Sequence, residues 1–243
     1  MTTLLVLPDR TDSAAGNMAT DLLLLESAVP ETLFYRRYGW AEPAFTFGVS
    51  QAREAVRAIA GDGPVLVRRA TGGGTVSHLN DMTYALVAPA GHAFAEAKAT
   101  ESYRAVHAAV ADALRCLGVP AEPVPCPRDT CGTTPASDVA TPRKPGVCFV
   151  QPEIYDVVRG DDGRKLAGAA QKRTRDGILF QGSVDKSACP EVDDWGAFDE
   201  ALIARLAMVC NADIVPGNFP VFPESREAGL RAQFSSDAWN GKR

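Results

Sequence analysis

The spacing of apolar residues along the chain predicts a mixture of strands and helices. Short runs rich in β-branched or aromatic residues indicate strands. Such runs cover residues 3–8, 33–38, 44–49, 65–69, 83–88, 147–155, 156–159 and 178–184. Apolar residues at intervals of three or four indicate helices over residues 17–27, 54–59, 95–117 and 195–209. The tail from Asn211 onward is first Pro-rich and then helical.

Capping and turn residues mark the ends of several of these elements. Asp12 or Ser13 precedes the first helix and can accept hydrogen bonds from its free backbone N–H groups. Gly118 follows the longest helix, at a position where a left-handed residue commonly ends a helix. Residues 39–43 predict a turn between the strands on either side. Residues 161–163, Asp-Asp-Gly, predict a hairpin turn.

The order of the elements favours an α/β (α+β) fold with a mixed, largely antiparallel β-sheet flanked by helices. Strands and helices do not alternate in the regular βαβ pattern of a parallel, doubly wound sheet. We expect one domain over residues 1–243, with a Pro-rich loop at about residues 120–146. The composition of this loop cannot bury enough apolar area to repay the entropy of ordering. Residues 124–145 are therefore expected to be dispensable for folding.

Composition excludes several function classes. Hydrophobic residues make up 46% of the 243 positions and charged residues 23%, which is typical of a soluble globular enzyme. The net charge of −5 gives no electrostatic basis for binding nucleic acid or an anionic membrane. No apolar run approaches the roughly 20 residues that span a bilayer. The N-terminus lacks the features of a secretory leader, so we expect a cytoplasmic protein.

The six cysteines do not predict a metal site. They lie at positions 116, 126, 131, 148, 189 and 210, and no two of them form a C-x-x-C pair. In a cytoplasmic chain of this size we expect reduced thiols, of which one or two at most have a chemical function.

Three segments carry residues suited to ligand chemistry. Residues 68–78 place two arginines and three consecutive glycines after a strand, and glycines allow a ligand to approach the backbone closely. The glycines alone fit a flexible turn equally well, and they match neither the phosphate loop nor the dinucleotide-binding fingerprint. Residues 163–173 hold Lys165 beside a run of small residues, and residues 177–184 predict the partner strand. A lone lysine such as Lys165 is otherwise most often a solvated surface charge.

The three segments together resemble a known superfamily. The patterns are R-R-x-T-G-G-G-x-V-x-H, G-R-K-x-A-G-A-A-Q-x-R and G-I-L-x-Q-G-S-V, in this order. With the upstream segments G-N-M-A-T-D, Y-G-W and F-G-V-S-Q, they resemble the lipoate-protein ligases and octanoyltransferases, which share the biotin/lipoate ligase-like catalytic domain. The resemblance covers roughly residues 10–210. The G-R-G-R-x-G signature of biotin ligases is absent.

This resemblance implies a mixed sheet with an acyl tunnel beside the glycine loop. Lys165 would contact the acyl carbonyl or an acyl-adenylate and stabilise developing negative charge. The acyl- or substrate-binding residues would be Arg68, Arg69, Thr71, Gly72, Gly73, Gly74, His78, Gly168, Ala169, Gln181 and Gly182. A lone histidine such as His78 is more often structural than catalytic. We expect the 68–78 and 165–173 segments to face one elongated apolar pocket, and Lys165→Ala to abolish acyl transfer with little loss of stability.

The superfamily contains ATP-dependent ligases and ATP-independent transferases. Residues 146–156 contain a segment that resembles the A-C-F-x-x-P-x-x-Y-E pattern of one transferase group, which makes Cys148 the candidate nucleophile. Residues 80–84 resemble the E-L-T-Y segment of that group. The intact Gly72–Gly74 run and the tail at residues 234–240 instead resemble ligases. Outside this context, Cys148 would be an ordinary small buried residue.

The resemblance is closest to the cysteine-dependent octanoyltransferases. It implies transfer of an octanoyl or lipoyl group from acyl carrier protein, through a Cys148 thioester and without a cofactor. The acceptor would be a lysine of a lipoyl carrier domain, such as the glycine-cleavage H protein or a dehydrogenase E2 subunit. The alternative is the catalytic subunit of a lipoate-protein ligase that uses ATP and Mg²⁺ and forms lipoyl-AMP. A non-catalytic acyl- or carrier-binding module is a third possibility.

Overall fold

Nine strands of the described residues form one large mixed sheet. The structure, a computed structural model, describes residues 1–126 and 152–242. The strands are β1 (Thr3–Val6), β2 (Arg10–Asp12), β3 (Thr32–Trp40), β7 (Asp81–Pro89), β8 (Ala121–Pro123), β9 (Val157–Arg159), β10 (Lys165–Thr174), β11 (Gly177–Asp185) and β12 (Asp213–Pro216). Their order is β12-β1-β3-β7-β11-β10-β9-β8, and β2 pairs with β3. The antiparallel pairings from β3 to β8 and the parallel pairings of β1, β2 and β12 confirm the expected mixed, largely antiparallel sheet.

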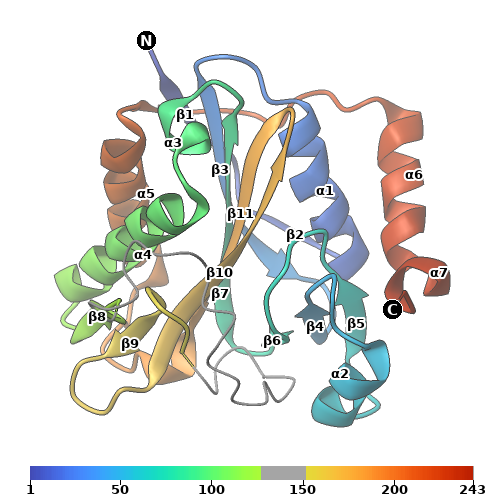
Figure 1. The fold of residues 1–243 in the computed structure, drawn as a ribbon, viewed down its shortest axis with the longest axis horizontal. Coiled ribbons are helices and arrows are strands. Elements are labelled where there is room, and N and C mark those ends of the chain that lie inside the picture. Colours follow the sequence, from blue (N-terminus) through green and yellow to red (C-terminus); the bar gives the residue numbers. More distant parts are fainter. Residues whose placement is uncertain (127–151, 243) are drawn as a thin grey trace.

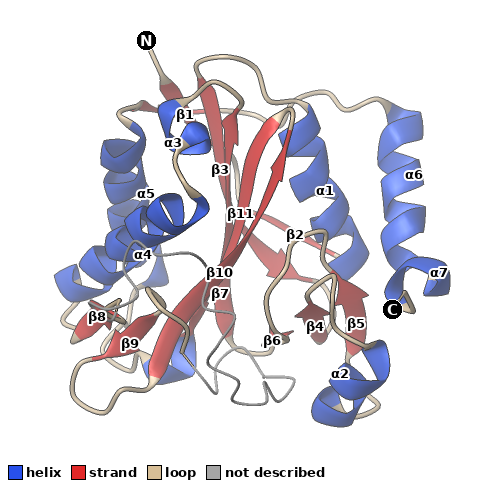
Figure 2. Ribbon diagram, viewed as in Figure 1, coloured by secondary structure: helices blue, strands red, loops and turns tan. Residues whose placement is uncertain are grey.

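Helices cover both faces of this sheet (Figures 1 and 2). On one face lie α3 (Ala93–Glu96), α4 (Ala99–Cys116) and α5 (Trp195–Cys210), and on the other lie α1 (Ala14–Glu26) and α6 (Glu224–Ser235). Alternate side chains of β3 pack against the helices on opposite faces of the sheet, because successive side chains of a strand point to opposite faces. Tyr35 packs in the cluster with α4 and α5, whereas Phe34 packs in the cluster with Leu24 and Leu25 of α1.

A small second sheet holds the glycine segment. It consists of β4 (Ala44–Phe47), β5 (Val65–Arg68) and β6 (Val76–Ser77), in the order β5-β4-β6, with α2 (Arg53–Ala60) packed against it. We expected the strands on either side of residues 39–43 to be joined by a turn. They instead belong to different sheets, because β3 continues through Trp40 and β4 pairs with the two strands that flank the glycines.

Helix ends follow the predicted capping residues with one exception. Ser13 caps α1 by accepting a hydrogen bond from the Gly16 N–H, and Gly118 has a φ of +83° just beyond α4. The predicted helix over residues 95–117 is wrong in one respect, since it is divided into α3 and α4. Lys98 has an extended backbone and caps α4, and the Glu101 side chain accepts a hydrogen bond from the Lys98 N–H.

The strands differ from the sequence prediction in two places and agree with it at one turn. The sequence pattern did not predict β12, a fully exposed four-residue strand in the Pro-rich tail. The predicted strand at 147–155 lies outside the described residues up to 151, and residues 152–155 form no strand. The predicted hairpin turn at 161–163 is confirmed between β9 and β10, where Gly163 has a φ of +73°.

The Pro-rich loop begins later than its composition suggests. The Val124 N–H donates to the Asp156 carbonyl at 2.8 Å, and the Val124 carbonyl accepts from the Tyr155 N–H at 3.0 Å. Val124 therefore belongs to the folded structure, and the segment expected to be dispensable must start after it. Residues 127–145 lie outside the described residues.

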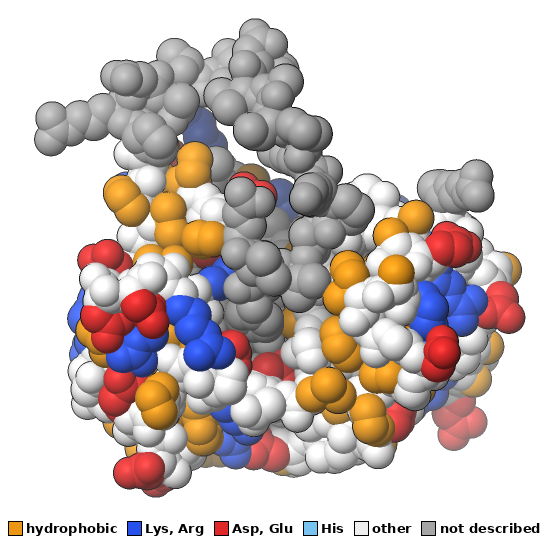
Figure 3. All heavy atoms as spheres, turned by 90° about the horizontal axis from the view of Figure 1, so that it is seen from below, with side chains coloured by type: hydrophobic (Ala, Val, Ile, Leu, Met, Phe, Trp, Pro, Cys, Tyr) orange, Lys and Arg blue, Asp and Glu red, His pale blue; other side chains and the backbone are white. Residues whose placement is uncertain are grey.

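Surface charge is mixed on the face seen from below. Figure 3 shows acidic and basic side chains next to one another there, among the residues drawn in colour. The coloured residues of this view therefore form no continuous basic surface of the kind that nucleic-acid binding requires. No helix in residues 1–126 or 152–242 is long and apolar enough to cross a membrane.

Candidate acyl-binding site

A pocket lies between the large sheet and the glycine segment. The lining residues are Met18, Tyr38, Trp40, Thr46, Arg69, Gly73, Val76, His78, Thr83, Gly168, Ala169, Ala170, Gln181, Gly182 and Ser183. The prediction that the two motif segments face one pocket is confirmed.

The floor of the pocket is a row of residues that crosses four strands. Gly168 of β10 pairs with Ser183 of β11, Ser183 pairs with Thr83 of β7, and Thr83 pairs with Tyr38 of β3. Directly paired residues of antiparallel strands point to the same face of a sheet, so all four contribute to one surface. The pocket therefore runs across the strands, from the small residues of β10 to the aromatic residues at the end of β3.

The glycine loop between β5 and β6 forms the opposite wall. Gly73 has a φ of +86°, a conformation that favours glycine. A Cβ on Gly48 would lie 2.1 Å from the Gly73 carbonyl oxygen, so the close packing of the loop on the end of β4 requires glycine at position 48. Arg69 donates to the Gly72 and Gly74 carbonyls at 2.8 and 2.9 Å. The Gly72 and Gly74 carbonyls thus fix the shape of the loop through Arg69, whereas Gly73 lines the pocket.

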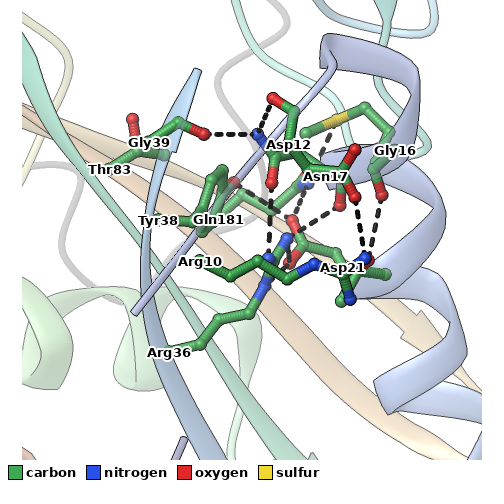
Figure 4. Close-up of polar contacts among 12 residues, drawn as sticks. Arg10, Asp12, Gly16, Asn17, Asp21, Arg36, Tyr38, Gly39, Thr83 and Gln181 are labelled. Atoms are coloured by element: carbon green, nitrogen blue, oxygen red, sulfur yellow. Dashed lines mark hydrogen bonds and ion pairs between the residues drawn. The ribbon is translucent and has the colours of Figure 1, made fainter. Parts of the chain in front are cut away.

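A buried polar network ties the loop to the sheet and to α1. Thr71 donates to Gln181 Oε1 at 2.8 Å, and Gln181 Nε2 donates to Asp21 Oδ2 at 2.6 Å. Asp21 pairs with Arg36 at 2.7 Å, and both side chains are fully buried. Tyr38 also donates to Asp21, at 3.1 Å, and Figure 4 shows these groups pointing toward one another between α1 and β3. A buried carboxylate is stable here because a guanidinium and two further donors surround it.

His78 is held on three sides. Its Nδ1 lies 2.8 Å from Asp81 Oδ2, its Nε2 lies 2.8 Å from Thr46 Oγ1, and its ring stacks on Trp40 with 3.8 Å between centroids. Thr46 Oγ1 accepts a hydrogen bond from Arg69 Nη1, which leaves its own proton for His78 Nε2. His78 then carries its proton on Nδ1 and donates it to Asp81.

Asp81 is suited to fix this tautomer. Burial raises the pKa of its carboxyl, but the facing His78 and the hydroxyls of Ser183 and Thr83 together hold that pKa below its usual value. Asp81 therefore remains ionised and accepts the His78 proton. With both ring nitrogens engaged, His78 shapes the pocket wall, and a direct catalytic role stays a prediction.

Lys165 is buried next to Gly168, which lines the β10 side of the pocket, but Lys165 is not itself a lining residue. Its side chain is 3% exposed and its Nζ lies 2.7 Å from Asp156 Oδ2, whose side chain is 1% exposed. A Cβ on Gly168 would lie 3.1 Å from Lys165 Nζ, so the absence of a side chain at this lining position makes room for the ammonium. The expectation that removal of Lys165 would cost little stability is therefore wrong, because Asp156 would be left as a buried, unpaired charge.

Arg68 points away from the pocket. Its guanidinium donates to the backbone carbonyls of Val49 and Gln51, and to those of Trp239, Asn240 and Lys242 around α7 (Asp237–Asn240). The sequence prediction of a substrate-binding Arg68 places the side chain on the wrong side of β5. Arg68 instead attaches the C-terminal residues to the end of β4 and the segment that follows it.

We expect Arg68→Met to destabilise the protein by about 3–5 kcal/mol, since several buried carbonyls lose a charged donor. Arg57→Met is the control, because Arg57 is an arginine of α2 whose carbonyl contacts lie mainly at the surface. The free energy of unfolding in urea measures the difference. Equal losses in the two variants would contradict the anchoring role of Arg68.

Of the remaining predicted residues, two line the pocket and one lies outside the described residues. Ala169 and Gly182 line the pocket. A Cβ on Gly182 would lie 2.1 Å from the Tyr84 ring, so the absence of a side chain at this position also leaves room for Tyr84. Cys148 lies outside the described residues. The sequence motifs did not identify the lining residues Met18, Tyr38, Trp40, Thr46, Val76, Thr83, Ala170 and Ser183. The Y-G-W segment was the available signal for Tyr38 and Trp40.

Comparison with protein families and curated sequences gives consistent matches. The model of the lipoyl protein ligase A/B catalytic domain matches residues 13–188. The octanoyltransferase LipM of Geobacillus kaustophilus is 35% identical over 178 residues, which cover 70% of this chain and 60% of the relative. LipM of Kyrpidia tusciae is 30% identical, with 94% of each chain covered. The chain thus spans about 60% of the length of the Geobacillus relative it matches.

Solved structures share the fold at lower identity. Lipoate-protein ligase A bound with ATP aligns with a TM-score of 0.70 and 20% identity, over 99% of this chain and 98% of the other. A bipartite lipoate protein ligase from Thermoplasma acidophilum, studied with its E2 lipoyl domain, aligns with a TM-score of 0.68 and 19% identity, over 99% and 96%.

Proposed function

The chain belongs to the lipoyl protein ligase A/B catalytic domain family, and we propose that it transfers an octanoyl or lipoyl group to a lysine of a lipoyl carrier domain. The observation that carries the proposal is a buried lysine next to Gly168, which lines the pocket. Gly168, Ala169 and Ala170 leave room for a chain beside the sheet, and Lys165 lies next to Gly168. The acceptor is a lipoyl domain such as that of the glycine-cleavage H protein or a dehydrogenase E2 subunit.

The donor in this proposal is an acyl carrier protein. The Cys148 thiolate attacks the donor thioester, and the carrier's thiol leaves as the Cys148 thioester forms. The acceptor's neutral ε-amine then attacks that thioester, an amide forms, and the Cys148 thiol is released. Each attack places negative charge on the acyl oxygen, which the ammonium of Lys165 stabilises. The relatives named octanoyltransferase support this branch.

An ATP-dependent ligase is the second candidate function. The three intact glycines at positions 72–74 favour it, because this form of the loop is typical of ligases. The enzyme would then bind ATP and Mg²⁺ and pass through lipoyl-AMP. A non-catalytic binding module is disfavoured by Lys165, because a purely structural role would not require an ion pair buried beside a ligand pocket.

The intact mass of a lipoyl domain, measured after incubation, separates these functions. We expect the domain to gain one octanoyl group with octanoyl-acyl carrier protein and without ATP. The matched reaction contains free lipoate, ATP and Mg²⁺ in place of the thioester donor. Modification only in the second reaction, with release of pyrophosphate, would assign the ligase function.

A further inference from the structure

We propose that Asp156, fixed by Tyr103, is a positioning residue that holds the ammonium of Lys165 against the acyl pocket. This inference rests on the proposed acyl transfer. Asp156 lies in the segment before β9, Tyr103 lies on α4 and Lys165 begins β10, so the folded sheet and helix bring the three together.

Asp156 is suited to act as a fixed anchor. Its Oδ1 accepts a hydrogen bond from the Tyr103 hydroxyl at 2.6 Å. Its Oδ2 accepts from the Glu153 N–H and from Lys165 Nζ, both at 2.7 Å. Donors on both oxygens prevent rotation of the carboxylate, since any turn would break at least one charge-assisted hydrogen bond. The position of the lysine ammonium is therefore set by groups that do not touch the pocket.

Lys165 needs such an anchor because of its own chemistry. A lysine has a long, flexible stem and normally extends its ammonium into water. The Lys165 side chain is only 3% exposed and passes over Gly168, where a Cβ would lie 3.0 Å from its Cε and 3.1 Å from its Nζ. Gly168 itself lines the pocket. The ion pair with Asp156 thus holds the ammonium beside Gly168, at the edge of the pocket.

Asp156 is the counter-ion of Lys165 among the residues that the structure describes. The titratable groups around Lys165 in the described part of the chain include Tyr103 and His107 of α4 besides Asp156. Burial lowers the pKa of His107 to about 4, so its ring is neutral at physiological pH and adds no positive charge beside the lysine. His107 Nδ1 lies 2.9 Å from the Tyr103 carbonyl, and its ring is 4.0 Å from the Tyr103 ring between centroids. His107 therefore packs against Tyr103 and restricts its ring.

Removing the anchor has two distinct consequences. A buried ammonium without a counter-charge loses its proton at lower pH, and neutral lysine no longer stabilises an oxyanion. Removing only the Tyr103 hydroxyl keeps the ion pair but frees one carboxylate oxygen. Asp156→Asn should therefore change both the protonation and the position of Lys165, and Tyr103→Phe should chiefly change its position.

A matched pair of tyrosine variants tests the inference. The Tyr35 hydroxyl, which is fully buried whereas Tyr103 is only partly buried, donates to the Asp199 carboxylate beneath β3, remote from Lys165. Tyr103→Phe and Tyr35→Phe thus remove the same kind of hydrogen bond. We expect Tyr103→Phe to lower the single-turnover rate of octanoyl transfer about tenfold, as for a group that orients a functional side chain. Tyr35→Phe should change that rate less than about twofold, with a similar loss of thermal stability.

The second measurement is independent of turnover. The lysine side chains are labelled with ¹³C, and the Lys165 signal is assigned by its absence in Lys165→Arg. We expect Asp156→Asn to lower the titration midpoint of Lys165 by at least about one pH unit. The alkaline limb of the pH–rate profile should move by the same amount, and the rate at its optimum should fall about 100-fold.

Two results would overturn the inference: an unchanged Lys165 midpoint in Asp156→Asn, or equal rate losses in the two tyrosine variants. Failure of the proposed function gives a different result. In that case the wild-type protein transfers no octanoyl group, and the Lys165 midpoint alone decides whether Asp156 controls the ammonium.

Discussion

Cys148→Ser is expected to slow octanoyl transfer from acyl carrier protein at least about 1,000-fold, as for loss of a catalytic nucleophile. A free cysteine has a pKa near 8.5, so a useful fraction forms thiolate once a nearby cation favours it. A serine hydroxyl is far harder to ionise at the same position. The thioester intermediate, which transfers the acyl group at little cost in energy, is then lost.

The covalent intermediate can be observed directly. Wild-type protein incubated with octanoyl-acyl carrier protein should gain one octanoyl group that hydroxylamine removes and that disappears when the acceptor domain is added. Cys126→Ser is the control, since it removes another cysteine that has no part in the proposed mechanism. A Cys148→Ser protein that keeps an ATP-dependent activity would refute the transferase and leave the acyl pocket unaffected.

Lys165→Ala is expected to lower the rate of acyl transfer about 100- to 1,000-fold, comparable to the loss of one oxyanion donor. We also expect a loss of about 3–5 kcal/mol in stability, because Asp156 stays buried without its partner. The rate is measured by the mass of the acceptor domain, and the stability by unfolding in urea. Lys172→Ala, on the same strand but partly exposed, is the control and should change neither quantity appreciably.

The double variant Lys165→Met, Asp156→Asn separates the two effects. Both charges are replaced by neutral groups of similar size, so much of the lost stability should return. The rate should stay low, because no ammonium remains at the pocket. Recovery of acyl transfer in this variant would show that Lys165 serves folding and not catalysis.

The sequence pattern predicted the pocket more completely than it predicted the role of each residue. Arg68 and Arg69 are adjacent in the motif, and both were assigned to the substrate. The alternation of side chains in an extended segment sends them to opposite sides, so only Arg69 reaches the pocket. This distinction needs the orientation of β5, which depends on its pairing with β4.

Contacts between distant segments were the part that the sequence could not predict. Tyr103 and Asp156 are 53 residues apart, and their hydrogen bond depends on how α4 lies against β10. The pocket floor likewise comes from four strands whose register was unknown. Helix ends were predicted better, because Ser13 and Gly118 act on backbone groups close to them in the chain. Strand β12 was missed because its residues are exposed and it is stabilised by pairing with β1.

The attachment of Arg68 to the C-terminal residues has a consequence for biosynthesis. The Arg68 side chain and its acceptor at Trp239 are separated by 171 residues. At ribosomal rates of about 5–20 residues per second, roughly 10–30 s pass between their synthesis. Throughout that interval Arg68 lacks the carbonyl acceptors of Trp239, Asn240 and Lys242 and has those of Val49 and Gln51. The ligand site should therefore mature last, after most of the large sheet has been able to form.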